Sequence, residues 1–151
     1  MIFQISIEEL SHPEFVRLAE TFYKESNLPG KFKQAHFITS WQKFYELNIG
    51  SIWVSAEDDL SKIHGAIGGL AHPDLYDGEL VVQELFWFVE PNAGFSDAFK
   101  LYLKLENWAK EKGAKRLNMA CVCNKHMQSV RSFYEKRGFR PVDVSYFKDL
   151  S

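Results

Sequence analysis

One tyrosine near the C-terminus stands where its phenol could act on a bound molecule. The segment Ser132–Phe139 reads as the last turns of a helix that ends at Gly138, with a strand beginning at once afterwards. Tyr134 lies one helical turn before that glycine, so its side chain can point into a cleft beside a sheet. A phenol with a pKa near ~10 is protonated at neutral pH, which suits it to donate a proton. Taken alone, the pattern is better explained as a surface helix with a glycine stop.

Two cysteines and a histidine form a second candidate group, Cys121-x-Cys123-x-x-His126. Residues of these types suggest zinc binding or a Cys–His nucleophile. Three ligands are too few for a structural zinc site, and no fourth follows at a suitable spacing, so we predict no metal. On a strand the two cysteines would point to the same face, where a mutual disulfide is geometrically poor. We therefore interpret them as core residues of a strand.

The composition indicates one ordered domain over residues 1–151. Of these residues 46% are hydrophobic and 15% are aromatic, enough for a full core around a sheet. The net charge of −2 offers no basic field for nucleic acid or a membrane. The chain has no long apolar run and no signal-peptide pattern at Met1–Gln4, so we expect a soluble, cytoplasmic protein.

Hydrophobic periodicity and turn signals predict the elements that position these residues. Ser11 is expected to cap the first long helix, with Pro13 in its first turn and Glu14 completing a capping box. Hairpins in the middle and crossover helices near the end predict an α/β fold, a mixed sheet of about six to seven strands flanked by about four helices. The strands are expected at 2–7, 51–56, 63–71, 80–89, 116–123 and 142–147, and the helices around 15–22, 38–45, 98–109 and Tyr134.

The order of these elements and several local strings resemble the GNAT family of acetyl-CoA-dependent N-acetyltransferases, in particular small GNAT proteins common in bacteriophage genomes. The resemblance covers nearly the whole chain. The motif Tyr-x-x-x-Gly-Phe at 134–139 is moderately specific alone and strong at this distance after the string Glu-Leu-Phe-Trp-Phe-Val. The strings that carry the resemblance are GAIGGL at 65–70, HPD at 72–74, ELFWFVEP at 84–91 and GFRPVDVSYFK at 138–148.

The resemblance implies a role for the strand at 80–89. In the family this strand carries a bulge, and its backbone hydrogen-bonds the pantetheine arm of acetyl-CoA; here that role falls to Trp87, Phe88 and Val89. Splaying from the next strand near 119–123 would open a slot for the thioester, and a backbone N–H near Phe88 would polarise the acetyl carbonyl. Tyr134 would line the cofactor site and protonate the departing thiolate as general acid.

The loop after this strand departs from the family pattern. The family's loop cradles the pyrophosphate with backbone N–H groups and usually carries Arg or Gln followed by small residues. Alignment on Ala98 puts Ala93 at the Arg or Gln position, while Asp97 adds a negative charge. Either Ser96 caps the helix and the amides hold acetyl-CoA with weakened affinity, or the cofactor site is lost and Asp97 is merely a favourable first-turn residue. We favour the first interpretation, which assigns cofactor contacts to Ala93, Gly94, Phe95, Ser96, Asp97 and Ala98.

Glu84 is the best candidate for the base that takes a proton from the amine. A carboxylate on the cleft-facing strand, flanked by apolar residues, could have a raised pKa. If the register shifts by one residue, Gln83 faces the cleft instead, and Glu79 or a chain of waters would then serve. A solvated Glu84 at the outer end of the strand is an alternative of equal weight.

The resulting hypothesis is an N-acetyltransferase in which a primary amine, of a small molecule or a protein, attacks the thioester of acetyl-CoA directly. The alternative is a GNAT-fold module with impaired catalysis, such as a phage protein that binds a host partner in the host cytoplasm. The net charge barely favours a cationic acceptor such as a polyamine, an aminoglycoside or lysine. Tyr146 and Phe147 either join a second copy in a homodimer or lie in the core.

Overall fold

The protein is described by a computed structural model that covers residues 1–151. It forms two compact units, Met1–Ala120 and Cys121–Ser151, and each is described by itself. The first unit holds a five-stranded mixed sheet whose strands lie in sequence order, the first four antiparallel and the last pair parallel. The predicted α/β class is confirmed, although the sheet has fewer strands than expected. The strands are β1 (Ile2–Gln4), β2 (Gly50–Ala56), β3 (Ile63–Pro73), β4 (Leu80–Val89) and β5 (Arg116–Asn118).

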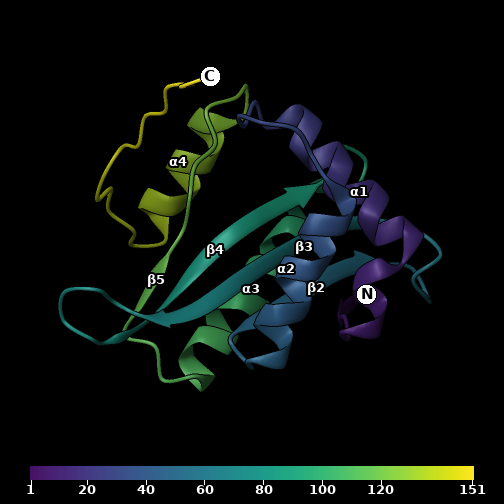
Figure 1. Cartoon of the computed structure of the whole chain (residues 1–151), viewed down its shortest axis with the longest axis horizontal. Coiled ribbons are helices and arrows are strands. Elements are labelled where there is room, and N and C mark those ends of the chain that lie inside the picture. Colours follow the sequence, from purple (N-terminus) through teal and green to yellow (C-terminus); the bar gives the residue numbers. More distant parts are fainter. The chain divides into compact units, whose positions relative to one another are not determined.

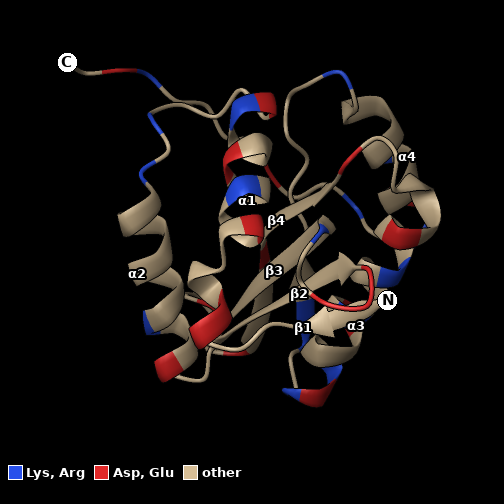
Figure 2. Ribbon diagram, turned by 90° about the vertical axis from the view of Figure 1, so that its right-hand side faces the viewer, with Lys and Arg blue, Asp and Glu red and all other residues tan.

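Helices cover both faces of this sheet (Figure 1). The helices α1 (Pro13–Glu25) and α2 (Gln34–Glu46) lie on one face, and α3 (Gly94–Glu111) lies on the other. Charged residues are concentrated on helices and loops (Figure 2), and the three long strands carry only one, Glu84. None of the helices combines the length and the apolar character needed to cross a membrane.

Each face of the sheet packs its own apolar cluster, as expected where the side chains of a strand alternate between two covered faces. On the α1 and α2 face, Phe15, Leu18 and Trp41 pack with residues of β2, β3 and β4. On the α3 face, Leu101 and Leu105 are fully buried against the opposite side of the same strands. This two-sided burial confirms that β4 is an interior strand.

The start of α1 differs by one residue from the predicted capping box. His12 is the N-cap, and its Nδ1 accepts the backbone N–H of Glu14 at 3.2 Å. Ser11 instead closes a short 3-10 helix (Glu8–Ser11), where its hydroxyl donates to the carbonyl of Glu8. The prediction that Ser11 caps the helix was wrong because the serine is the last residue of this preceding 3-10 helix.

Tyr45 joins α2 to the edge of the sheet through a buried hydroxyl. That hydroxyl donates to the carbonyl of Ile5 at 2.8 Å and accepts the N–H of Ile52 at 3.1 Å. Burial raises the pKa of Tyr45 to about 12, so the group stays a neutral donor and acceptor. These two hydrogen bonds join α2 to β2 and to the residue that follows β1.

In the second unit, α4 (Met127–Lys136) ends in a Schellman motif, which accounts for the Tyr-x-x-x-Gly-Phe spacing. Gly138 has φ +90°, and its N–H donates to the carbonyl of Glu135. The N–H of Phe139 donates to the carbonyl of Tyr134 at 2.9 Å, and the two rings lie 5.3 Å apart between centroids. The tyrosine is therefore part of the helix stop as well as a candidate functional group.

Three expected strands are shorter or absent. β1 ends at Gln4 and not at Ile7. β5 ends at Asn118 and not at Cys123, and the segment 142–147 forms no strand. In that segment Tyr146 and Phe147 are exposed, so they do not pack in the core of the structure. Alternating side chains favour an extended backbone, but a strand also needs a neighbour to pair with, and the local sequence does not encode one.

Candidate functional site

A bulge interrupts β4 at its middle. Gly68 of β3 pairs with Phe86, whereas Gly69 pairs with Glu84, so Leu85 is one extra residue on β4. The extra residue brings Leu85 and Phe86 to the same face of the sheet, toward α1 and α2. The bulge that the family resemblance implied is thus confirmed, and its position is now defined.

The backbone of β4 beyond the bulge has a definite orientation. The N–H of Glu90 donates to the carbonyl of His64 at 2.7 Å, across to β3. Because backbone groups alternate along an antiparallel strand, those of Phe88 also point to β3, and those of Trp87 and Val89 point to the other edge. The ladder between β4 and β5 ends at Gln83 and Asn118. The edge predicted to hold the pantetheine arm therefore offers the backbone groups of Trp87 and Val89, the two residues that flank Phe88.

The side chain of Trp87 fixes this stretch of β4 to α3. Its Nε1 donates to the carbonyl of Ala98 at 3.2 Å, and its ring lies 6.1 Å from that of Tyr102. Phe88 points the opposite way, where its ring meets Phe22 edge-on. The backbone edge is thus held by packing on both faces of the sheet.

Glu84 is buried on the α3 face. It pairs directly with Gly69, whose missing side chain leaves room beside Leu105. Only 6% of Glu84 is exposed, and this burial raises the pKa of its carboxyl to about 8. A hydrogen bond from the backbone N–H of Ala120 opposes that rise. The alternative of a solvated glutamate at the strand's outer end was therefore wrong.

The position of Glu84 also bears on how the two parallel strands separate. The carboxyl reaches the backbone of Ala120 two residues beyond Asn118, where the regular ladder has ended. The carboxyl of Glu84 thus accepts a backbone N–H just beyond the end of the β4–β5 hydrogen-bond ladder, where the regular backbone pairing has stopped. Gln83 lies on the opposite face by alternation, and Glu79 is exposed in the loop before β4, so neither replaces Glu84 as a buried carboxyl.

The loop after β4 leads directly into α3. The helix begins at Gly94, with Ala93 as N-cap and no side-chain cap, so the prediction that Ser96 caps it was wrong. The carboxylate of Asp97 accepts the hydroxyl of the buried Ser55 at 2.7 Å. Asp97 is thereby directed at β2 and serves to fix the first turn of α3 on the sheet.

These features fit the pyrophosphate of acetyl-CoA, although no basic residue lies in 91–98. α3 starts at Gly94, and the backbone N–H groups at the start of a helix are of the kind that anions bind. The charge of Asp97 is engaged with the sheet. Phe95 is 68% exposed and stacks on Phe99, so its bulk lies along the helix.

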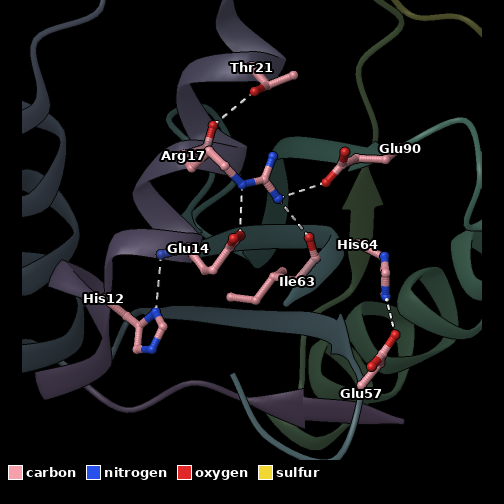
Figure 3. A network of polar contacts seen from close by, with 8 residues as sticks. All are labelled: His12, Glu14, Arg17, Thr21, Glu57, Ile63, His64 and Glu90. Carbon is pink, nitrogen blue, oxygen red and sulfur yellow. Dashed lines mark hydrogen bonds and ion pairs between the residues drawn. The ribbon is translucent and has the colours of Figure 1, made fainter. Parts of the chain in front are cut away.

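A polar network anchors the end of β4 just before this loop (Figure 3). The guanidinium of Arg17 on α1 donates to Glu90 at 2.8 Å and to the carbonyl of Ile63 at 3.1 Å. It also bonds Glu14 at 2.7 Å, and these carboxylates raise its pKa. Sequence reasoning missed this network, since only the local spacing of Glu14 and Arg17 hints at it.

The two cysteines do not lie in a core strand, so that expectation was wrong. Cys123 is exposed, and Cys121 is half-buried with its thiol donating to the carbonyl of Met127 at 3.5 Å. The structure brings together no group of three or more His, Cys, Asp or Glu side chains that could hold a metal.

The fold and the β4 edge define a class of protein: a mixed sheet with a bulged interior strand, next to a parallel partner and a helix N-terminus. Comparison with known families identifies that class. The model of the acetyltransferase (GNAT) family matches residues 12–139 of this chain. The chain therefore belongs to the GNAT acetyltransferase family.

Solved structures agree in fold at low sequence identity. A Trypanosoma brucei acetyltransferase is 17% identical with a TM-score of 0.71, covering 99% of each chain. Glucosamine-6-phosphate N-acetyltransferase from Arabidopsis thaliana is 16% identical with a TM-score of 0.74, covering 100% of this chain and 98% of that one. A predicted acetyltransferase from Clostridium acetobutylicum, solved with acetyl-CoA, is 18% identical with a TM-score of 0.75, covering 99% and 96%. None of the curated proteins compared with the chain matches it.

Proposed function

We propose that this protein is an acetyl-CoA-dependent N-acetyltransferase that transfers the acetyl group to a primary amine by direct attack. The observation that carries the proposal is the orientation of the β4 edge beyond its bulge, in a chain of a family of acetyltransferases. Acetyl-CoA supplies an activated thioester. The outward backbone groups of Trp87 and Val89 bind its pantetheine arm, and the N–H groups at Gly94–Ser96 bind its pyrophosphate.

Two side chains are proposed to move protons. Glu84 accepts a proton from the attacking ammonium through water, at the point where β4 and β5 separate, because its pKa of about 8 lies close to the pH at which the amine must be deprotonated. Tyr134 donates a proton to the sulfur that leaves as thiolate. The amine nitrogen bonds the acetyl carbon and the carbon–sulfur bond breaks. The nitrogen then loses its second proton, which restores the phenol of Tyr134, and Glu84 releases the first proton to water, so the products are the amide, the free thiol and one proton.

The test is a comparison of Tyr134→Phe with Tyr76→Phe, a tyrosine that is 94% exposed in the β3–β4 loop. With a general acid removed, we expect kcat to fall about a hundredfold or more, with little change in the affinity for acetyl-CoA. Thiol release and calorimetry measure the two quantities. A Tyr134→Phe enzyme as fast as the control would remove Tyr134 from the mechanism.

A second function is favoured by one specific observation, the absence of Lys and Arg from 91–98. In that case the chain is a GNAT-fold binding module with impaired catalysis, which engages a protein partner. Titration of the protein with acetyl-CoA at millimolar concentration separates the two functions. Measurable binding supports the transferase, and no heat at all supports the module.

A further inference from the structure

An apolar cavity lies between α1, α2 and the face of the sheet that β3 and β4 present to them. Its volume is about 140 Å³, similar to the roughly 150 Å³ of an apolar cavity that takes up benzene. We call it the aromatic pocket. The residues that line it are Phe15, Leu18, Ala19, Phe22, Tyr23, Phe32, Phe37, Trp41, Ala66, Leu85, Phe86 and Phe88.

The bulge in β4 builds the floor of this pocket. It places Leu85 beside Phe86, and Leu85 is still 42% exposed, so it stands at the mouth. Gly68 makes room for the floor, because a Cβ there would come within 2.6 Å of the ring of Phe86. The same few residues of β4 thus shape the pocket and direct the outward backbone of Trp87.

The walls are aromatic rings that meet at angles. Phe86 contacts the rings of Phe15, Phe22 and Trp41 at centroid distances between 5.6 and 6.4 Å. Trp41 meets Phe86 edge-on, whereas Phe15 and Phe22 are tilted against it. Rings set at such angles offer both faces and edges to a guest, which favours an aromatic guest over a flexible alkyl chain. The shape is therefore suited to one flat ring.

The lining carries no charge. Its polar side-chain groups are the indole N–H of Trp41 and the hydroxyl of Tyr23, and that hydroxyl already donates to the carbonyl of Pro29. Glu84, the one carboxyl of β4, lies on the opposite face of the sheet. A molecule with several ammonium groups would lose hydration in this pocket with no carboxylate in return. Polyamines and aminoglycosides are therefore poor fits.

We propose that the aromatic pocket binds the apolar body of the acceptor, and that the acceptor is a primary amine carrying one aromatic ring on a short linker. This inference rests on the proposed acetyl transfer and names its substrate class. The ring lies among Phe22, Trp41 and Phe86, and the ammonium stays at the mouth near Leu85, beside the β4 edge.

Calorimetric titration with phenethylamine, without acetyl-CoA, tests the pocket independently of catalysis. Ala19→Phe fills the pocket from α1, and Ala35→Phe makes the same change at an exposed position of α2 outside it. We expect phenethylamine to bind the wild type and Ala35→Phe alike, and Ala19→Phe about tenfold or more weakly, as for steric changes in an apolar pocket. Spermidine should bind at least about tenfold more weakly than phenethylamine.

The inference is overturned if phenethylamine does not bind, if it binds Ala19→Phe as well as the control, or if spermidine binds as tightly. A parallel titration with acetyl-CoA keeps the two proposals apart. Loss of acetyl-CoA binding alone overturns the transferase and leaves the pocket standing. Acetylation of spermidine without phenethylamine binding overturns the pocket and leaves the transferase standing.

Discussion

The free energy of unfolding should depend on pH through the single carboxyl of Glu84, and replacing Glu84 by glutamine should remove most of that dependence. The side chain is buried and holds the backbone N–H of Ala120. Glutamine has nearly the same shape and an oxygen that can accept the same hydrogen bond, but it cannot ionise. Any difference between the two proteins that changes with pH therefore reports the charge of Glu84.

The sign and size of the effect follow from the pKa. Burial raises it from an ordinary 4.5 to about 8, so between these values the folded protein binds more protons than the unfolded chain. The free energy of unfolding then falls as the pH rises through this range. The full rise corresponds to about 5 kcal/mol above pH 8, and about 3 kcal/mol is already lost at neutral pH.

The assay is urea unfolding of the wild type, Glu84→Gln and the exposed control Glu46→Gln. At about pH 5 all three should agree within about 1 kcal/mol. At about pH 9 Glu84→Gln should exceed the wild type by several kcal/mol, whereas the control should follow the wild type. Parallel pH profiles for the wild type and Glu84→Gln would refute the claim that Glu84 is buried in its neutral form.

Activity adds an independent readout of the same residue. If Glu84 is the base, the acetylation rate of the wild type rises with pH toward about 8, where the carboxyl ionises. Glu84→Gln should then lose about a hundredfold or more in kcat/KM while gaining stability. A stabilised variant with full activity would leave the burial argument intact and exclude Glu84 as the base.

Three further predictions concern other parts of the chain. Ala93→Arg should tighten acetyl-CoA binding about fivefold through one charged contact, while Leu75→Arg should not. Equal Kd values for Ala93→Arg and the wild type by calorimetry would contradict this. Gly138→Ala should destabilise the end of α4 by about 1–2 kcal/mol, since its φ is +90°, and unchanged amide exchange there would contradict it. Tyr45→Phe should lower the free energy of unfolding by about 1–3 kcal/mol because two buried backbone groups lose their partner; a loss no larger than that of Tyr76→Phe would contradict it.

Local sequence patterns predicted the helices and strands whose conformation depends mainly on neighbouring residues in the chain. The strand Leu80–Val89 has the expected bounds, and the apolar stripes of α1, α2 and α3 pack as expected. Periodicity and turn residues are properties of a short stretch of chain, so they can be read without knowing the neighbours. The family resemblance also rested on short strings, and the family match over 12–139 confirms it.

The predictions that failed depend on partners far along the chain. The side chains of residues 142–147 alternate as in a strand, yet the segment forms no strand. Ser11 does not cap α1 because it belongs to the 3-10 helix that precedes it. Sequence reasoning left open whether Gln83 or Glu84 faces the cleft, because a shift of one residue exchanges the faces. It also did not find the aromatic pocket, which needs α1, α2 and β4 together.

The sequence by itself determined which chemical groups are available: one glutamate in a long apolar strand, a tyrosine before a glycine stop, and a helix start without a basic residue. The tertiary structure decided which way these groups point and whether they are buried. Pairing with β3 places the bulge at Leu85, and that bulge sets which backbone groups face outward. Burial within the sheet, opposite Gly69, removes water from Glu84 and raises its pKa. Both effects arise from contacts between distant segments, and a local pattern carries no record of them.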